Sequence, residues 1–185
     1  MISRLVASRS LVATARPLAA RLSTSAAHVA APGAPVQTVP LLIGGEFVQS
    51  TGDVAMPVRD PATQRTLANA PQATLAEMNA AVDAATAAFP KWSTTSVSNR
   101  ARVMFKLQAL IRQHEDELAA ILSAEHGKTL DDAKGDIFRG LEVVEHACSI
   151  TSLQMGETVP GVATSTDVTS FRLPLGVCAG IAPFN

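Results

Sequence analysis

The sequence predicts an α/β fold in which short paired strands come first, several helices follow, and strands resume near residue 185. Three observations predict this order. A Gly44–Gly45 pair separates two strand-like segments, apolar residues recur at helical spacing from Thr74 to Leu153, and β-branched residues become frequent after Gly156. We expect the chain to contain hairpin strands, helices and the first strand of a parallel sheet, and to end as that sheet begins.

The first strands are expected in the segment Val39–Ser50. Its apolar runs flank Gly44–Gly45, and a Gly-Gly pair suits a hairpin turn because glycine accepts positive φ at both central positions. Further along the chain, Asp60 followed by Pro61 predicts a loop.

The first helix is expected to begin at Thr74. Thr74 and Glu77 have the spacing of a capping box, in which each side chain bonds to the backbone N–H of the other residue. Its apolar face comprises Leu75, Met78, Val82 and Ala85. Phe89–Pro90 is expected to end it, because proline has no N–H for the helical ladder.

Two more helices are expected before the last strands. One begins near Ser98 and its turns continue to Gly127, since glycine tolerates the left-handed conformation at a helix end. Its apolar positions are Val103, Leu107, Leu110 and Ile111, then Leu118, Ile121 and Leu122. The other spans roughly Leu130–Leu153, with a buried stripe formed by Ile137, Leu141, Val144 and Cys148.

The last part of the chain is expected to form strands. Thr158–Val162 and Val168–Leu175 are rich in β-branched residues and could pair with each other. Gly176–Pro183 is a short apolar run of small residues, typical of a strand buried in a parallel sheet.

The amino-terminal residues have a composition of their own. Residues 1–30 hold Arg4, Arg9, Arg16 and Arg21 among serines and alanines, and the first carboxylate of the chain is Glu46. An Arg-rich, Ser-rich, acid-free leader is typical of a mitochondrial transit peptide. We therefore expect residues 1–30 to be a transit peptide and loose arm, directing the protein to the mitochondrial matrix; a disordered basic tail is the alternative.

Composition bounds the remaining function classes. Hydrophobic residues make up 47% of the chain, which argues against disorder, and no apolar run approaches the ~20 residues of a membrane-spanning helix. All 16 acidic residues follow the leader, so the folded part lacks the basic balance of a nucleic-acid-binding domain. We expect no nucleic-acid partner, no membrane and no metal. Cys148 and Cys178 form no zinc or redox motif and are expected to be buried hydrophobic residues.

Three motifs resemble the aldehyde dehydrogenase superfamily. Phe89-Pro90-Lys91-Trp92 followed by Arg100 resembles its F-x-x-W … R segment, and residues 125–129 resemble its E-x-G-K segment. Residues 174–177 leading to residues 181–185 resemble its P-x-G-V … P-W-N motif, with Phe184 where most members carry Trp. Longer matches at residues 138–148, 155–158 and 172–185 are similar to the methylmalonate-semialdehyde dehydrogenase subfamily, in which Phe at this position is usual.

The resemblance implies roles for residues near position 185. Asn185 matches the side-chain amide of the family's oxyanion hole, which donates to the developing alkoxide. Ala182 and Phe184 match strand-end positions that line the nicotinamide of NAD, as expected for an open α/β sheet. The alternatives are that Asn185 is a loop residue and that Ala182 and Phe184 only pack in a core.

Arg139 is the residue that the resemblance suggests for substrate binding. A semialdehyde of this subfamily carries a carboxylate, which a planar guanidinium can hold through two hydrogen bonds. Arg139 also lies one helical turn from Glu142, so a structural pair within the helix is the competing interpretation.

The activity that the resemblance implies is NAD-dependent oxidation of malonate or methylmalonate semialdehyde, with coenzyme A as co-substrate. The family's cysteine nucleophile and its phosphate-binding unit are expected beyond Asn185. Residues 31–185 are therefore expected to be the amino-terminal part of one aldehyde dehydrogenase domain, inactive alone and homo-oligomeric at full length. The alternatives are a mitochondrial aldehyde dehydrogenase that hydrolyses its acyl-enzyme, and a non-catalytic product that associates with full-length subunits through exposed strand edges.

Overall fold

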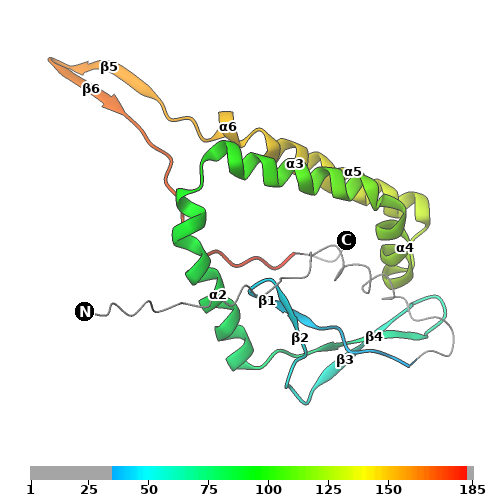
Figure 1. Ribbon diagram of the computed structural model, residues 1–185. Helices are drawn as coiled ribbons and strands as arrows, with labels where there is room; N and C mark the ends of the chain where they lie inside the picture. The colour runs from blue at the N-terminus through cyan, green and yellow to red at the C-terminus, as the bar shows by residue number, and fades with distance from the viewer. Residues whose placement is uncertain (1–34, 183–185) are drawn as a thin grey trace, which may run out of the picture.

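The computed structural model describes residues 35–182 and confirms the mixed α/β organisation (Figure 1). The predicted leader, residues 1–30, lies outside the described residues. Within residues 35–182 the strands form three separate two-stranded antiparallel sheets, and helices occupy the stretch between the second and third sheets. None of the described helices is long and apolar enough to cross a membrane.

The first hairpin forms where the Gly-Gly pair predicts it. β1 (Leu41–Ile43) pairs with β2 (Glu46–Val48), with Leu42 opposite Phe47. Gly44 and Gly45 adopt φ of 61° and 83°, so the turn uses the positive φ that glycine permits.

A second hairpin joins β3 (Ala55–Arg59) to β4 (Thr66–Pro71), around the predicted Asp-Pro loop. The Asp60 side chain fixes this loop by accepting a hydrogen bond from the backbone N–H of Ala62 at 2.8 Å. The sequence did not predict these two strands. β3 contains Pro57, which argues against a central strand but is tolerated because β3 pairs only with β4 and is therefore an edge strand.

The helix α2 (Leu75–Thr94) begins with the predicted capping box. The Thr74 hydroxyl accepts from the Glu77 N–H at 3.3 Å, and the Glu77 carboxylate accepts from the Thr74 N–H at 2.8 Å. Glu77 also accepts from the Thr51 N–H at 2.7 Å and the Ser50 hydroxyl at 3.0 Å. These donors, the Thr51 and Thr74 N–H groups first, lower the pKa of Glu77 from 4.5 to about 2.

The expectation that Phe89–Pro90 ends this helix was wrong, because α2 continues to Thr94 with the proline inside it. Proline removes one backbone donor from the ladder. Hydroxyl groups supply other donors to the last carbonyls: Ser93 bonds to the carbonyl of Pro90 at 3.1 Å, and Thr95 to that of Lys91 at 2.8 Å. Carbonyls near the end of the helix, where backbone donors run out, thereby gain side-chain donors.

Four further helices replace the two expected ones. α3 (Val97–Gln113) begins near Ser98 as predicted, and α4 (Glu115–His126) ends at Gly127; His114 separates them. α5 (Leu130–Cys148) is likewise separated from the short α6 (Ile150–Leu153). The helical stretches were therefore predicted correctly, but their internal breaks were not.

The helical core lies where α5 packs against α3 and α4. Small side chains allow these helices to approach closely, and the buried residues there are Ala101, Ala119, Ala133, Leu141 and Cys148. The predicted stripe of α5 is confirmed, since Leu141 and Cys148 are buried and Ile137 and Val144 are half-buried. Surface ion pairs join the same helices, Arg112 to Glu145 at 2.6 Å and Lys134 to Asp116 at 2.7 Å.

The third hairpin projects away from the helices (Figure 1). β5 (Thr158–Ala163) pairs with β6 (Thr166–Thr169), which confirms that the two β-branched segments pair, and every residue of both strands is exposed. The second strand ends at Thr169 rather than at Leu175.

The predicted buried strand at Gly176–Pro183 does not form in the described residues. Residues 170–182 contain no strand, and Ile181 is fully exposed. An apolar run becomes a parallel strand only when a neighbouring strand supplies its hydrogen-bond partners. None of the strands described in residues 35–182 pairs with this segment.

A close contact ties the β3–β4 hairpin to the end of α4. Gly127 has φ of 84°, and a Cβ added there would lie 2.6 Å from Cγ of Pro61. The proline ring therefore occupies the space that a side chain at residue 127 would need.

We predict that Gly127→Ala lowers the free energy of unfolding by roughly 1–3 kcal/mol, because it combines left-handed strain with a clash against Pro61. Gly140→Ala is the matched control. Gly140 is a helical glycine whose added Cβ would meet nothing within 4 Å, so alanine is expected to raise stability slightly. Denaturant unfolding of both variants checks this, and equal stability of the two would contradict it.

Glu77 predicts a pH dependence of stability. Its folded pKa of about 2 lies below the ordinary 4.5, so its contribution is fully present above pH 4.5 and is lost as pH falls toward 2. We expect Glu77→Gln to be less stable than the parent at pH 6 and the difference to shrink over that window. Thermal unfolding followed by circular dichroism measures it, with Glu142→Gln as the control; a difference independent of pH would refute the assignment.

Candidate functional site

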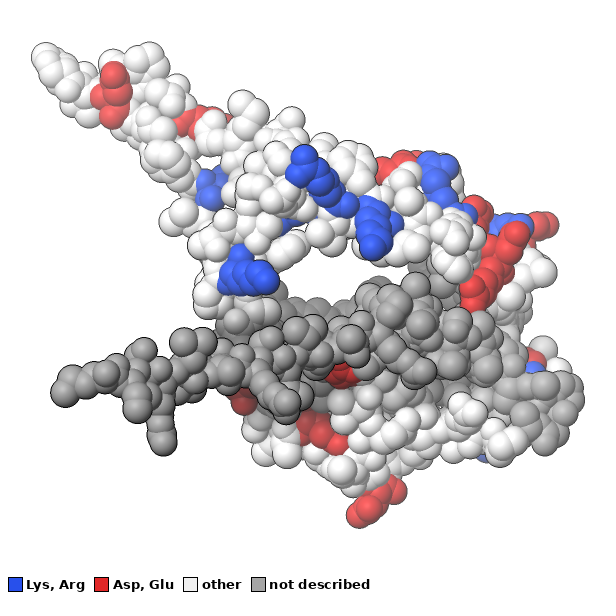
Figure 2. All heavy atoms as spheres, viewed as in Figure 1, with Lys and Arg blue, Asp and Glu red and all other residues white. Residues whose placement is uncertain are grey.

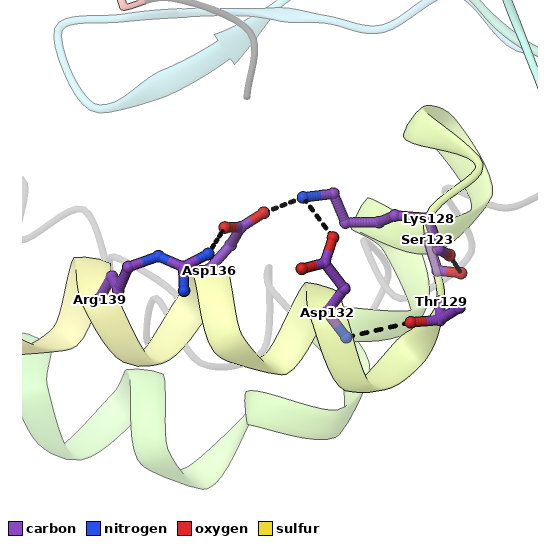
Figure 3. A network of polar contacts seen from close by, with 6 residues as sticks. All are labelled: Ser123, Lys128, Thr129, Asp132, Asp136 and Arg139. Atoms are coloured by element: carbon purple, nitrogen blue, oxygen red, sulfur yellow. Dashed lines mark hydrogen bonds and ion pairs between the residues drawn. The ribbon is translucent and has the colours of Figure 1, made fainter.

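The turn between α4 and α5 is fixed by three local features (Figure 3). Gly127 ends α4 in the left-handed conformation. The Ser123 hydroxyl donates to the Lys128 carbonyl at 2.6 Å, and the Thr129 side chain caps α5 by accepting from the Asp132 N–H at 3.2 Å. The backbone of Lys128 is thereby held at the start of α5.

The Lys128 side chain extends along the first turns of α5. Its ammonium group lies 3.2 Å from the carboxylate of Asp132 and bonds to that of Asp136. The side chains of Lys128 and Asp136 are only 9% and 15% exposed. The hydrogen bond to Asp136 raises the pKa of Lys128, and the bonds from Lys128 and then Arg139 lower the pKa of Asp136.

Arg139 binds the other oxygen of the same carboxylate (Figure 3). Its Nη2 donates to Oδ1 of Asp136 while Lys128 bonds to Oδ2. The structure thus gives Arg139 a partner within its own helix, and this partner is Asp136 rather than the expected Glu142. The Arg139 side chain remains 64% exposed.

The sequence carried a signal for this network that was not used. Lys128, Asp132 and Asp136 follow one another at intervals of four residues, and Arg139 comes three residues later. Residues three and four apart lie on the same face of a helix. Opposite charges at this spacing therefore predict a linked row, although they do not reveal which members are shielded from water.

The segment after β6 returns to α2 and joins two of the sequence motifs. Gly176 and Val177 close a groove of about 260 Å³ whose other walls come from α2. Those walls are Ala85, Ala88, Phe89 and Trp92. The P-x-G-V motif thus lies against the F-x-x-W motif, and Figure 1 shows the segment running beside α2.

A second pocket places the arginine of the first motif beside the same segment. Arg100 and Gln154 line a space of about 220 Å³ together with Arg172, Leu173 and Pro174. Arg100 Nη2 donates to Oε1 of Gln154 at 2.5 Å, while its Nε is buried and makes no hydrogen bond. Three sequence-distant parts of the chain therefore meet at the base of the segment that leads to residue 182.

The predicted site residues are not brought together in the described part of the chain. Ala182 is exposed and lies outside regular secondary structure, and neither of the two pockets includes it or Arg139. Phe184 and Asn185 lie outside the described residues. Cys148 is buried as expected, but Cys178 is exposed, because it lies in the segment that does not form a strand.

Neither of the two pockets described above is large enough by itself to enclose a dinucleotide. Their volumes, about 220 and 260 Å³, lie below the ~300–1,000 Å³ typical of sites that enclose a small molecule, and Ala182 is exposed. Residues 35–182 also contain no cluster of His, Cys, Asp or Glu able to hold a metal ion. On the face seen in Figure 2, basic and acidic side chains occur side by side over the helices.

Comparison with known proteins relates the chain to one family. The model of the aldehyde dehydrogenase family matches residues 47–185. The human mitochondrial methylmalonate-semialdehyde/malonate-semialdehyde dehydrogenase (acylating) is 54% identical over 150 residues, covering 81% of this chain and 28% of that protein. The Arabidopsis thaliana mitochondrial methylmalonate-semialdehyde dehydrogenase (acylating) is 52% identical over 164 residues, covering 89% and 27%.

Solved structures give the same relation. A structure from Sinorhizobium meliloti 1021, described as a methylmalonate-semialdehyde dehydrogenase complexed with NAD, has a TM-score of 0.78 and 42% identity. The match covers 82% of this chain and 31% of the chain in that structure. The methylmalonate-semialdehyde dehydrogenase of Oceanimonas doudoroffii has a TM-score of 0.72 and 36% identity. That match covers 76% of this chain and 28% of the chain in that structure. The chain thus spans about 28% of the length of the curated relatives it matches.

The groove on α2 predicts a spectroscopic signal, because Trp92 is the single tryptophan of the chain and lines this groove together with Val177. We expect Val177→Ser to shift the fluorescence emission of Trp92 to longer wavelength, because a hydroxyl in place of the valine side chain makes the groove around the indole more polar. Val143→Ser, on an exposed position of α5, is the control and should leave the emission unchanged. Identical spectra for the parent and Val177→Ser would show that the segment does not sit on α2.

Proposed function

Because the chain belongs to the aldehyde dehydrogenase family, we propose that it forms part of an NAD-dependent, CoA-acylating methylmalonate- or malonate-semialdehyde dehydrogenase. The observation that carries the proposal is the 54% identity over 150 residues to a human enzyme of that name. The contact between the F-x-x-W and P-x-G-V motifs supports it, since the folded chain places them together.

The proposed reaction oxidises the aldehyde carbon of the substrate and releases its carboxyl group as carbon dioxide. The semialdehyde, NAD and coenzyme A give NADH, carbon dioxide and either propionyl-CoA or acetyl-CoA. This chemistry belongs to the breakdown of valine and pyrimidines.

Each predicted site residue has a proposed role. The Asn185 side-chain amide donates to the oxyanion that forms when the aldehyde is attacked, an interaction worth ~3–4 kcal/mol in comparable enzymes. Ala182 and Phe184 line the nicotinamide. The seating of Gly176 and Val177 on α2 supports these roles, because it fixes the start of the segment that leads to them.

Arg139 is proposed to hold the carboxylate of the substrate. A guanidinium has five N–H donors in a planar fork, and this one is bound to Asp136 while its side chain stays 64% exposed. It can therefore bind Asp136 and a second carboxylate at the same time. An uncharged aldehyde would gain nothing from this residue.

The protein is proposed to act in the mitochondrial matrix. The first relatives compared are named mitochondrial, and residues 1–30 have the composition of a transit peptide. Residues 31–185 are proposed to be the amino-terminal part of the aldehyde dehydrogenase domain, in a subunit that forms homo-oligomers. The full-length enzyme is proposed to supply its cysteine nucleophile from residues other than Cys148 and Cys178, so residues 1–185 alone should be inactive.

Two alternatives remain distinct from this proposal. A related dehydrogenase could release its acyl group to water rather than to coenzyme A. A non-catalytic chain could instead associate with full-length subunits, and the exposed β5–β6 hairpin favours this, because both of its strands present unpaired edges.

The test is to supply the purified holoenzyme that contains this chain with malonate semialdehyde and NAD, with and without coenzyme A. We expect NADH, carbon dioxide and acetyl-CoA in the complete mixture, measured by absorbance and mass spectrometry, and no turnover by residues 1–185 alone. Free acid formed at the same rate without coenzyme A would indicate the hydrolytic enzyme. Absence of NADH in every mixture would refute the dehydrogenase assignment.

A further inference from the structure

We propose that Asp136 is a positioning residue for the substrate-binding Arg139, and that Lys128 offsets the negative charge of Asp136 so that Arg139 can still attract an anion. This inference rests on the proposed function, since it takes Arg139 as the group that holds the substrate carboxylate. It assigns a role to the row of charges on the first half of α5.

The geometry shows how one carboxylate can serve both cations. Oδ2 of Asp136 bonds to Lys128 and Oδ1 bonds to Arg139, so neither cation displaces the other (Figure 3). The Arg139 guanidinium folds back over its own helix, and a Cβ at Gly135 would lie 3.5 Å from its Nη1. The bond to Asp136 therefore orients the guanidinium above α5, while most of the side chain stays exposed.

Burial divides the network into an anchor and an accessible end. Lys128 and Asp136 are 9% and 15% exposed, whereas Arg139 is 64% exposed. Salt weakens the attraction between Lys128 and Asp136 less than it would weaken an exposed ion pair, and a ligand can reach the arginine that Asp136 binds. Fixing a long, flexible side chain before binding reduces the ordering cost that binding must otherwise overcome.

Charge explains why the network needs the lysine. Asp136 alone would orient Arg139 but would also repel an anionic substrate approaching the same guanidinium. Lys128 pairs with Asp136 and, at 3.2 Å, with Asp132, so the two cations balance the two carboxylates before substrate binds. Without Lys128 the group becomes net negative beside the arginine.

The same network depends on the turn that precedes α5. The Ser123 hydroxyl holds the carbonyl of Lys128 at 2.6 Å, and Thr129 caps the helix that carries Asp136 and Arg139. The E-x-G-K segment therefore influences Arg139 through the Lys128 side chain, although Arg139 lies about two and a half helical turns beyond the start of α5.

The experiment compares KM and kcat of the holoenzyme for malonate semialdehyde and for propanal, which has no carboxylate. Arg139→Gln is expected to raise KM for the semialdehyde about tenfold or more and to leave propanal unaffected. Asp136→Asn and Lys128→Gln should each raise it about three- to tenfold, again only for the semialdehyde. With Asp136→Glu, KM for the semialdehyde should return part of the way to the parent value. Asp131 is an exposed acid of the same helix, and Asp131→Asn should leave KM unchanged for both substrates.

The outcomes separate the two proposals. If Arg139→Gln leaves KM for the semialdehyde unchanged, the substrate role of Arg139 fails and the positioning role fails with it. If Arg139→Gln raises this KM but Asp136→Asn and Lys128→Gln do not, only the positioning role is overturned. The positioning role is also overturned if the Asp136 and Lys128 variants impair KM and kcat for propanal as much as for the semialdehyde, because that result would indicate a role in folding alone. In the Asp136→Asn/Arg139→Gln double variant, KM should be no higher than in Arg139→Gln alone.

Discussion

The partly buried pair of Lys128 and Asp136 is the interaction on which the charged face of α5 depends. Two opposite charges shielded from water need both each other and additional hydrogen bonds, and here Asp132 and Arg139 supply them. The pair can form only because the preceding turn aims the lysine along the helix. That turn in turn requires the left-handed Gly127, against which Pro61 of the β3–β4 hairpin packs. A loop contact and a charge network are thus parts of one arrangement.

Few apolar side chains are buried in the described part of the chain, and many large ones are exposed. Three of the six buried side chains are alanines at the crossing of α5 with α3 and α4, whereas larger residues such as Leu75, Phe105 and Val143 are exposed. Exposed apolar surface of this kind is available for packing against other protein surface.

Features set by a few neighbouring residues could be predicted from the sequence. The Thr74–Glu77 capping box, the Gly44–Gly45 turn and the end of α4 at Gly127 each depend on chemistry within about four residues. Features decided by distant partners could not. Pro90 stays inside α2 although a proline ordinarily stops a helix, and Gly176–Pro183 finds no neighbouring strand in the described chain. The site followed the same division: Arg139 was found by resemblance, but its bond to Asp136 required the folded helix.

Glu77 has a consequence for the order in which the chain acquires structure. Its bond to Thr74 spans three residues, whereas its bond to Thr51 spans 26. Short-range contacts close earlier, since long loops cost more entropy to close. We therefore expect the capping box at the start of α2 to close before the bonds that join Glu77 to Ser50 and Thr51, just after the first hairpin.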